Sequence, residues 1–161
     1  MENINDVRGN DTILTIAKND VKVCRSMLMI YKQTSDDLYI KESAVKLHQC
    51  IEKYLKHLIK TSGRRYPKSH DLEELIHICE NECNFTINET IKKYAETITG
   101  WYLKLRYVSS YYIKGQILSE CLPVMEEILS KTEERPLPKP VDSEVSTAIG
   151  SLGNSRSFHT S

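Results

Sequence analysis

The sequence predicts an all-α protein. In five stretches of the chain, apolar residues recur every three or four positions, which is typical of helices with one buried face. Residues that favour helix starts stand ahead of several of these stretches; they are Asn10, Asp11, Asp71 and Asn88. No alternating strand-like run and no Asn-Gly hairpin signal occurs in the 161 residues. We therefore expect a single helical domain, because one domain usually has about 100–200 residues.

The two longest stretches predict a pair of neighbouring helices. The first covers residues 13–31. In the second, apolar residues follow intervals of four, three, four, four and three; they are Ile40, Ala44, Leu47, Ile51, Leu55 and Leu58. Lysines and glutamates, including Glu52 and Lys56, fill the opposite side, so we expect one buried and one solvated face. Residues 33–37 favour a turn between antiparallel helices, and Gly63 favours the end of the second helix.

Three shorter helices follow. Residues 71–83 predict an acidic helix, and residues 88–105 and 117–128 predict two more. Pro123 lies inside the last stretch and removes a hydrogen bond to the carbonyl of Ser119, so we expect a kink or a restart there.

We divide the chain into an N-terminal lead (1–10), a helical bundle (11–131) and a flexible C-terminal tail (132–161). From Arg135 onward there are three prolines in six residues and then mainly small polar residues. Such a segment does not bury enough apolar surface to offset its ordering entropy. A short docking element within residues 145–152 is the alternative for part of the tail.

The composition is that of a soluble globular protein. Apolar residues make up 40% and charged residues 27%. The longest apolar run is far shorter than the ~20 residues of a membrane helix, and the N-terminus lacks the features of a signal peptide. We expect a cytoplasmic protein that does not bind a membrane.

We expect no metal site and no cofactor. The five cysteines are scattered, and only Cys79 and Cys83 are close, one helical turn apart. No second ligand pair follows them, which favours buried thiols over a zinc site. The sequence also lacks a Gly-rich phosphate loop, HExxH, an EF-hand loop and a G-x-S-x-G elbow.

The net charge of zero conceals two segments of opposite sign. Residues 41–70 contain eight Lys or Arg and two Glu, whereas residues 71–100 contain two Lys and seven Asp or Glu. These segments are either solvated helix faces that attract each other or, around Arg64, Arg65 and Lys68, a phosphate-binding surface.

The order of three motifs resembles the HEPN domain family. The motifs are SAVKLHQCIEKYLKHLIKTSG, then SHDLEEL, then WYLKLRYV, and the resemblance covers roughly residues 11–130. It implies an antiparallel bundle of four or five helices, commonly dimeric. Many members of the family are metal-independent ribonucleases, and others are inactive partners of nucleotidyltransferases in toxin–antitoxin or defence systems.

Ribonuclease members of the family carry an R-x4–6-H motif, and two copies form one composite site. Arg106 matches the arginine, but the positions of the histidine hold Tyr111, Tyr112 and Ile113. Tyrosine, with a pKa near 10, is a poor proton shuttle near pH 7. We therefore expect no imidazole within reach of Arg106 and a protein without its own catalysis. The alternative is a ribonuclease with an atypical site of Arg106 and Tyr111 at a dimer interface.

Arg106 lies four residues after Tyr102 and eight after Ile98, so on a continuous helix it leans towards a neighbouring helix and is partly buried. Its donors then need a carboxylate, carbonyls at a helix end, or a phosphate. His70 is either a packing residue at a helix start or a ligand contact. We expect His48 and His57 at the surface or in a helix seam.

Four tyrosines near Arg106 combine apolar area with a polar tip; they are Tyr102, Tyr107, Tyr111 and Tyr112. They suit a subunit interface, with ordinary core or base stacking as alternatives.

The resulting hypothesis is a binding or interaction protein of a prokaryotic toxin–antitoxin, defence or nucleotidyltransferase-linked system. Its expected partners are a second copy, a nucleotidyltransferase or another defence protein. A bound RNA or nucleotide would contact a set of basic residues, namely Arg64, Arg65, Lys68, His70 and Arg106.

Overall fold

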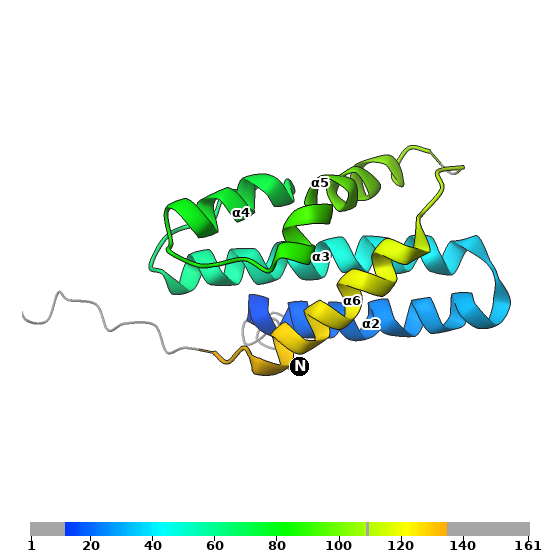
Figure 1. Cartoon of the computed structure of the whole chain (residues 1–161), viewed down its shortest axis with the longest axis horizontal. Coiled ribbons are helices and arrows are strands. Elements are labelled where there is room, and N and C mark those ends of the chain that lie inside the picture. Colours follow the sequence, from blue (N-terminus) through cyan, green and yellow to red (C-terminus); the bar gives the residue numbers. More distant parts are fainter. Residues whose placement is uncertain (1–11, 109, 135–161) are drawn as a thin grey trace, which may run out of the picture.

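A computed structural model describes residues 12–108 and 110–134 (Figure 1). The described part contains the helices α2 (Ile13–Thr34), α3 (Asp37–Thr61), α4 (Leu72–Asn81), α5 (Glu89–Lys104) and α6 (Gly115–Lys131), and no strand. The all-α class is therefore confirmed. The predicted lead (1–10) and most of the predicted tail lie outside the described residues, and this division of the chain stays a prediction.

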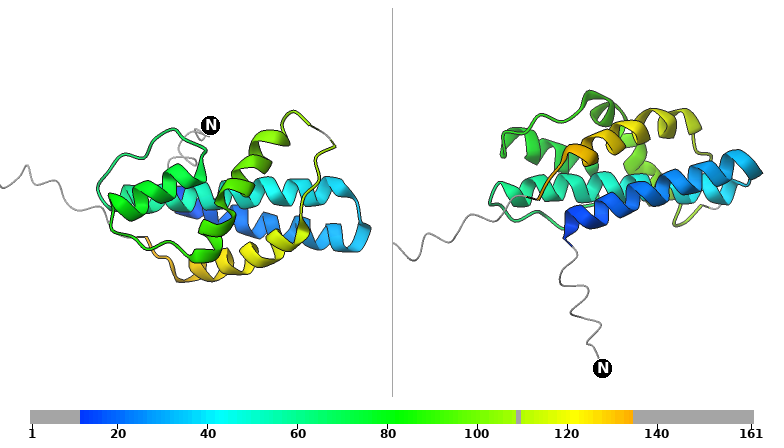
Figure 2. Two further views of the ribbon diagram at one scale, coloured as in Figure 1. Left: turned by 45° about the horizontal axis from the view of Figure 1, so that its top comes forward. Right: turned by 90° about the horizontal axis from the view of Figure 1, so that it is seen from below.

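Helix α3 lies at the centre of the fold. It packs against α2 on one side and against α4 and α5 on the other, and α6 crosses α2 and α3 (Figures 1 and 2). The apolar stripe predicted for α3 is confirmed, because all six of its members are buried. The predicted solvated face is wrong in part: Glu52 and Lys56 are buried as well. Since α3 is covered from both sides, its second face holds charged groups inside the bundle.

Helices α2 and α3 form the predicted antiparallel pair. The turn between them is short, with Ser35 in the left-handed conformation at φ 56°. Asp36 caps α3 by accepting a hydrogen bond from the Leu38 amide, and Thr12 caps α2 by accepting one from Thr15. Gly63, at φ 86°, follows the end of α3 as predicted.

A buried carboxylate lies between these two helices. Asp20 of α2 is 6% exposed, and its side chain accepts a hydrogen bond of 2.6 Å from Lys53 of α3. Lys46, two turns earlier on α3, lies 3.6 Å from the same carboxylate. The charge of Asp20 is thus balanced by two lysines whose side chains are partly buried.

The loop of residues 62–71 runs back along α3 instead of continuing away from it. His70, at the end of this loop, contacts His48 in the middle of α3. Helix α4 then runs in the same direction as α3, because Cys79 contacts the Leu55 carbonyl and Glu82 lies beside Arg64. The side chain of Asp71 caps α4 as predicted, accepting from the amides of its first turn. This return path brings the loop next to the centre of the bundle.

Helix α6 is one continuous helix with Pro123 inside it, so the predicted restart does not occur. Its buried side chains include Leu118, Leu122 and Met125, and this apolar face holds the helix against α2 and α3. Packing therefore offsets the lost hydrogen bond at Pro123.

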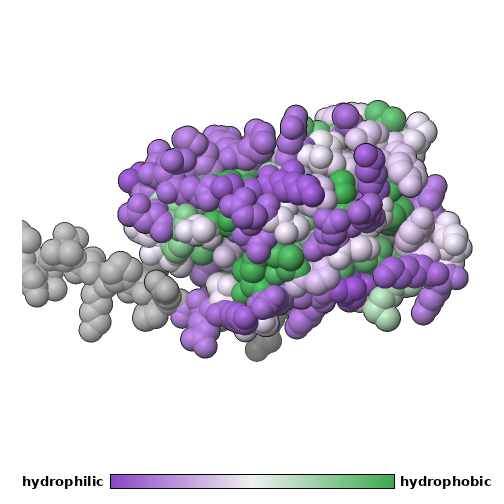
Figure 3. Space-filling view, in the orientation of Figure 1, coloured by the Kyte–Doolittle hydropathy of each residue, from purple (hydrophilic) through white to green (hydrophobic). Residues whose placement is uncertain are grey.

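The face of the molecule seen in Figure 3 is mainly hydrophilic, with apolar residues in small groups between charged side chains. Among the described helices, none has the length and apolar character needed to cross a bilayer.

Candidate functional site

Tyr102, near the end of α5, is the centre of a cluster of polar side chains. Its ring is 6% exposed and stacks on the imidazole of His48 from α3, with ring centroids 4.1 Å apart and 9° between the planes. The guanidinium carbon of Arg106 lies 4.1 Å from the centroid of the same ring. Two groups at this distance clash on one face of a ring, so His48 and Arg106 lie on opposite faces. The ring of His70 approaches Tyr102 to 5.3 Å between centroids, tilted by 45°.

Two residues of α3 hold His70 in place. The carbonyl oxygen of His70 lies 2.8 Å from Nε2 of His48. A carbonyl only accepts, so this nitrogen of His48 carries a hydrogen. The Nδ1 of His70 lies 3.1 Å from both carboxylate oxygens of Glu52. Backbone and ring of His70 are therefore each tied to α3, although its side chain is 52% exposed.

Glu52 is a buried carboxylate with two cationic or hydrogen-bonding partners. Lys56, one turn later on α3, donates a hydrogen bond of 2.7 Å to it, and His70 supplies the second contact. Burial opposes ionisation of Glu52, but the hydrogen bonds from Lys56 and His70 outweigh it and lower the pKa of the carboxyl below its ordinary value. Glu52 is therefore ionised near pH 7 and can only accept hydrogen bonds.

His48 is fully buried in the seam between α3 and α5, so of the two places expected for it, the surface and a helix seam, the seam is the observed one. Burial lowers the pKa of His48, although the hydrogen bond to the His70 carbonyl works in the opposite direction. Its Nδ1 makes no hydrogen bond and lies 3.7 Å from Glu52. His48 is thus a neutral ring that fixes Tyr102 by stacking and His70 by its N–H. His57, 6% exposed, is also buried and lies outside this cluster, beside Tyr54 and Thr132.

Arg106 lies beyond the end of α5, which stops at Lys104, and it is exposed. The expectation of partial burial on a continuous helix is therefore wrong. In the part of the chain that the structure describes, no carboxylate lies within ion-pair distance of its guanidinium; its contacts are the ring and the hydroxyl of Tyr102. Since the helix ends two residues earlier, the chain turns and lays the arginine over the tyrosine.

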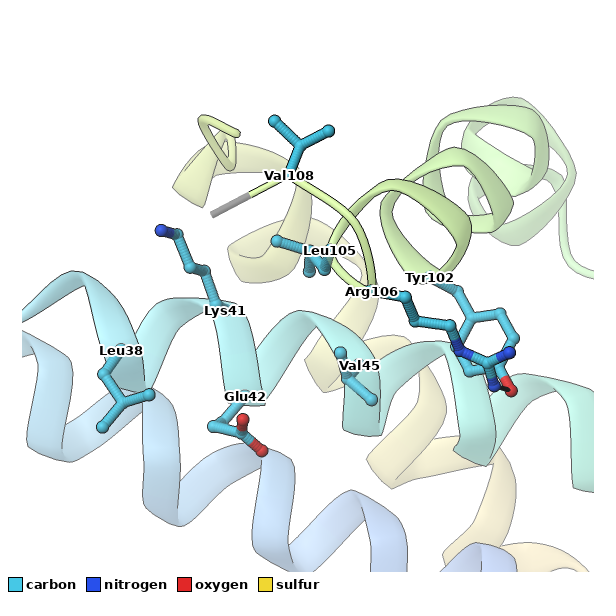
Figure 4. A pocket seen from close by; sticks show the side chains of 8 residues that line it. All are labelled: Leu38, Lys41, Glu42, Val45, Tyr102, Leu105, Arg106 and Val108. Carbon is cyan, nitrogen blue, oxygen red and sulfur yellow. Dashed lines mark hydrogen bonds between the residues drawn. The ribbon is translucent and has the colours of Figure 1, made fainter. Parts of the chain in front are cut away.

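Beside Arg106 there is an open groove of about 370 Å³ between α3 and the end of α5. Its lining is Leu38, Lys41, Glu42, Val45, Tyr102, Leu105, Arg106 and Val108 (Figure 4). Figure 4 shows the arginine and Tyr102 at one end of the groove and Leu38 at the other. The groove thus offers an exposed guanidinium next to apolar walls.

The other predicted tyrosines take different positions. Tyr111 is half-buried, and the ammonium of Lys104 lies 4.9 Å from its ring centroid. Among the described residues Tyr111 makes no hydrogen bond to Arg106. Tyr107 and Tyr112 are 85% and 79% exposed, whereas Tyr102 is inside the cluster. Of the four, Tyr107 and Tyr112 present the most area to a partner.

The predicted basic set is only partly brought together. His70 and Arg106 meet at the ring of Tyr102. Arg64 instead pairs with Glu82 near the end of α3, with 3.3 Å between nitrogen and oxygen. Arg65 and Lys68 are exposed on the same return loop.

The sequence reasoning missed Glu52, His48 and Lys56 as members of a site. A signal was present, because residues 48, 52 and 56 are four apart and lie on one side of a helix. It also missed that the imidazoles of His48 and His70 both lie against the ring of Tyr102, which Arg106 also contacts. The expectation that no imidazole lies within reach of Arg106 stays a prediction.

Among the described residues, no group of three or more His, Cys, Asp or Glu side chains is arranged to hold a metal ion. Cys79 is buried and Cys83 is half-buried, and neither forms a disulfide.

The fold and the cluster define a small helical-bundle protein with an arginine displayed beside a groove. A sequence model of the HEPN domain family matches residues 25–135, which is more than half of the chain. The chain therefore belongs to the HEPN domain family, and the resemblance seen in its motifs is confirmed. No significant match was found among curated proteins or among solved structures.

Proposed function

We propose that this HEPN domain protein binds a phosphate group of RNA or of a nucleotide through Arg106, as a component of a prokaryotic toxin–antitoxin, defence or nucleotidyltransferase-linked system. Membership of the HEPN family supports an RNA-related or defence role. The system and the partner go beyond what the family alone indicates.

The observation that carries the proposal is the exposed guanidinium of Arg106 on the ring of Tyr102. A guanidinium stacked on an aromatic ring keeps its edge free for a planar, bidentate contact with a phosphate. Tyr102 is itself fixed by His48, so the arginine is held in position before a ligand arrives. Base or ribose could then lie along the apolar walls of the groove next to it.

A partner surface is proposed next to this groove. Several large apolar side chains are exposed around the end of α5 and the following connection; they are Leu38, Leu103, Tyr107, Val108 and Tyr112. Exposed tyrosines with aliphatic neighbours have the composition of an interface core. A second copy or a nucleotidyltransferase is the proposed occupant. Light scattering of wild type and of a Tyr107→Ser, Tyr112→Ser variant tests self-association, and the variant should be monomeric where the wild type is dimeric.

Binding is tested with a fluorescent, 2′-O-methylated RNA oligonucleotide and, separately, with ATP. Arg106→Ala should weaken binding at least about tenfold, since a charge-assisted hydrogen bond contributes ~1.5–3 kcal/mol. Lys22→Ala removes an exposed cation of α2 and serves as the control. Affinity should also fall as salt rises, because phosphate contacts release counterions. Equal affinity of Arg106→Ala and wild type for both ligands would overturn the proposal.

The alternative is a ribonuclease with an atypical site of Arg106 and Tyr111 at a dimer interface. Within one chain, among the described residues, Tyr111 contacts Lys104 and makes no hydrogen bond to Arg106, so this alternative needs a second subunit. Tyr111→Phe keeps this ring and removes the hydroxyl. If Tyr111→Phe abolishes RNA cleavage while the protein stays dimeric, the ribonuclease alternative replaces the proposed binding function.

A further inference from the structure

We infer that the protein has a second anion site, in an open pocket between the first turns of α2 and the second half of α3, and that this pocket takes a ligand with two or more linked phosphate groups. The pocket has a volume of about 480 Å³. Its lining is Thr12, Ile13, Ile16, Glu52, Lys53, Lys56, Lys60 and Tyr66. The groove beside Arg106 is lined by other residues, so the inference does not depend on the proposed function.

Lysines outnumber carboxylates around this pocket. Lys53, Lys56 and Lys60 are three and four residues apart, so they lie on one side of α3 and span about 10.5 Å along it. Lys53 pairs with Asp20 and Lys56 pairs with Glu52. Lys60 is exposed and makes no ion pair within residues 12–108 and 110–134. The pocket therefore keeps a positive charge that its own side chains do not balance.

The buried ammonium of Lys56 is the observation that points to a ligand. Lys56 is 7% exposed, and its ammonium has three hydrogens. Among the described residues, one of them is donated to Glu52 at 2.7 Å, and the ammonium also lies 5.6 Å from the ring centroid of Tyr66. Buried donors without an acceptor cost free energy, and the oxygens of a bound anion supply acceptors. Because Glu52 holds Lys56, this donor is in position before a ligand arrives.

Linked phosphates fit these contacts better than carboxylates do. Lysine binds phosphate as a point charge, and a terminal phosphate carries about 1.5–2 negative charges and three acceptor oxygens. A diphosphate or triphosphate chain brings several such groups to lysines that are spread along one side of a helix. An acidic peptide carries at most one charge per residue. Ile13, Ile16 and Tyr66 form an apolar side of the pocket, which suits an organic group attached to the phosphates.

The test is calorimetric titration of the full chain with inorganic tripolyphosphate in the presence of EDTA. Wild type should bind it, and Lys60→Ala should bind at least about tenfold more weakly, because a hydrogen bond to a charged group is lost. Lys60→Glu reverses the charge and should weaken binding further. Lys60 is exposed, so both variants should fold, and circular dichroism checks this. Lys22→Ala, at an exposed lysine of the neighbouring helix α2, is the matched control.

A second titration distinguishes two sources of the phosphates. ATP is titrated into Arg106→Ala, so that the groove beside Arg106 does not contribute its guanidinium. Tighter binding of ATP than of tripolyphosphate supports a nucleotide as the ligand, because the base or ribose then adds contacts. Weaker binding of ATP supports a free polyphosphate.

Equal affinity of Lys60→Ala and wild type for tripolyphosphate would overturn the inference, and so would the absence of binding by wild type. An equal loss of affinity in Lys22→Ala would overturn it too, since it indicates non-specific attraction of a polyanion. If hexaglutamate binds as tightly as tripolyphosphate, the pocket is a site for acidic peptides instead. The proposed function is measured separately, by RNA binding of Arg106→Ala, so either proposal can fail without the other.

Discussion

The imidazole of His48 lies flat against the phenol ring of Tyr102, with 4.1 Å between centroids. This contact joins the middle of α3 to the last turn of α5, and neither ring has appreciable exposed surface. It fixes the point at which α5 ends and therefore where Arg106 emerges.

Replacing Tyr102 separates the contribution of its ring from that of its hydroxyl. Tyr102→Ala should lower the free energy of unfolding by ~3–5 kcal/mol, as for other buried aromatic residues. Tyr102→Phe keeps the stack on His48 and loses only the hydroxyl contact with Arg106, so its effect should be about 1 kcal/mol. Urea denaturation measures both. Equal losses for the two variants would contradict a supporting role of the ring.

Glu52→Gln should lower the free energy of unfolding near pH 7 by roughly 3 kcal/mol, because it leaves the buried Lys56 without its anion. The pKa of Glu52 is lower in the folded chain than its ordinary value of 4.5. As pH falls below that value the unfolded chain takes up the proton first, so the stabilisation by Glu52 is lost at acid pH. The difference between wild type and variant should therefore shrink near pH 3. Glu42→Gln, at an exposed glutamate of the same helix, serves as the control.

His48 should make the fold less stable as pH falls from about 7 to about 5. Burial lowers its pKa below the ordinary 6.5, against a weaker opposing effect of its hydrogen bond to His70. Below 6.5 the unfolded chain binds a proton that the folded chain excludes, so folding stability decreases. His48→Gln should remove this part of the slope in urea denaturation. Burial also lowers the pKa of His57, so His57 should contribute its own loss of stability at low pH, and this loss should persist in the His48→Gln variant.

The start of α4 should depend on its cap. Asp71 accepts hydrogen bonds from the amides of Glu73 and Glu74, and it directly follows His70. Asp71→Ala should cost ~1 kcal/mol of folding free energy. Asn88→Ala, the corresponding change at α5, should destabilise by a similar amount, and urea denaturation measures both.

Thiol labelling should distinguish Cys83 from the other cysteines. Burial raises the pKa of Cys24 to about 11 and the pKa of Cys79 and Cys121 to about 12, and Cys50 is also fully buried. A maleimide reagent near pH 7 should therefore modify one thiol quickly in the native protein and five in urea. Cys83→Ser should abolish the fast phase. Rapid loss of two or more thiols in the native state would contradict the packing.

The helices were predictable from the sequence because their signals are local. The stripe on α3, the caps at Asp71 and Asn88, and the stop at Gly63 all follow from neighbouring residues, and each is present in the structure. The missing hydrogen bond at Pro123 predicts a kink or a restart of the helix. The restart expected there does not occur, because apolar packing on both sides of Pro123 holds α6 together.

The cluster at Tyr102 was not predictable in the same way. His48 and Glu52 are a turn apart, but what makes them a site is His70, 18 residues after Glu52. That contact depends on the return path of the loop 62–71, which no periodicity encodes. The spacing of Ile98, Tyr102 and Arg106 predicts a continuous helix, whereas α5 ends at Lys104, so Arg106 is exposed and contacts Tyr102. The course of a loop and the end of a helix thus determine which side chains meet at Tyr102.

The carboxylate of Asp20 has a consequence for the alignment of α2 with α3. A slip of one helical turn would move it by about 5.4 Å, so that it would lose at least one of its two lysine partners, Lys46 and Lys53. Apolar stripes tolerate such a slip, since leucine meets leucine again one turn further on. The buried anion with its two lysines therefore favours one register out of several that hydrophobic contact alone would permit.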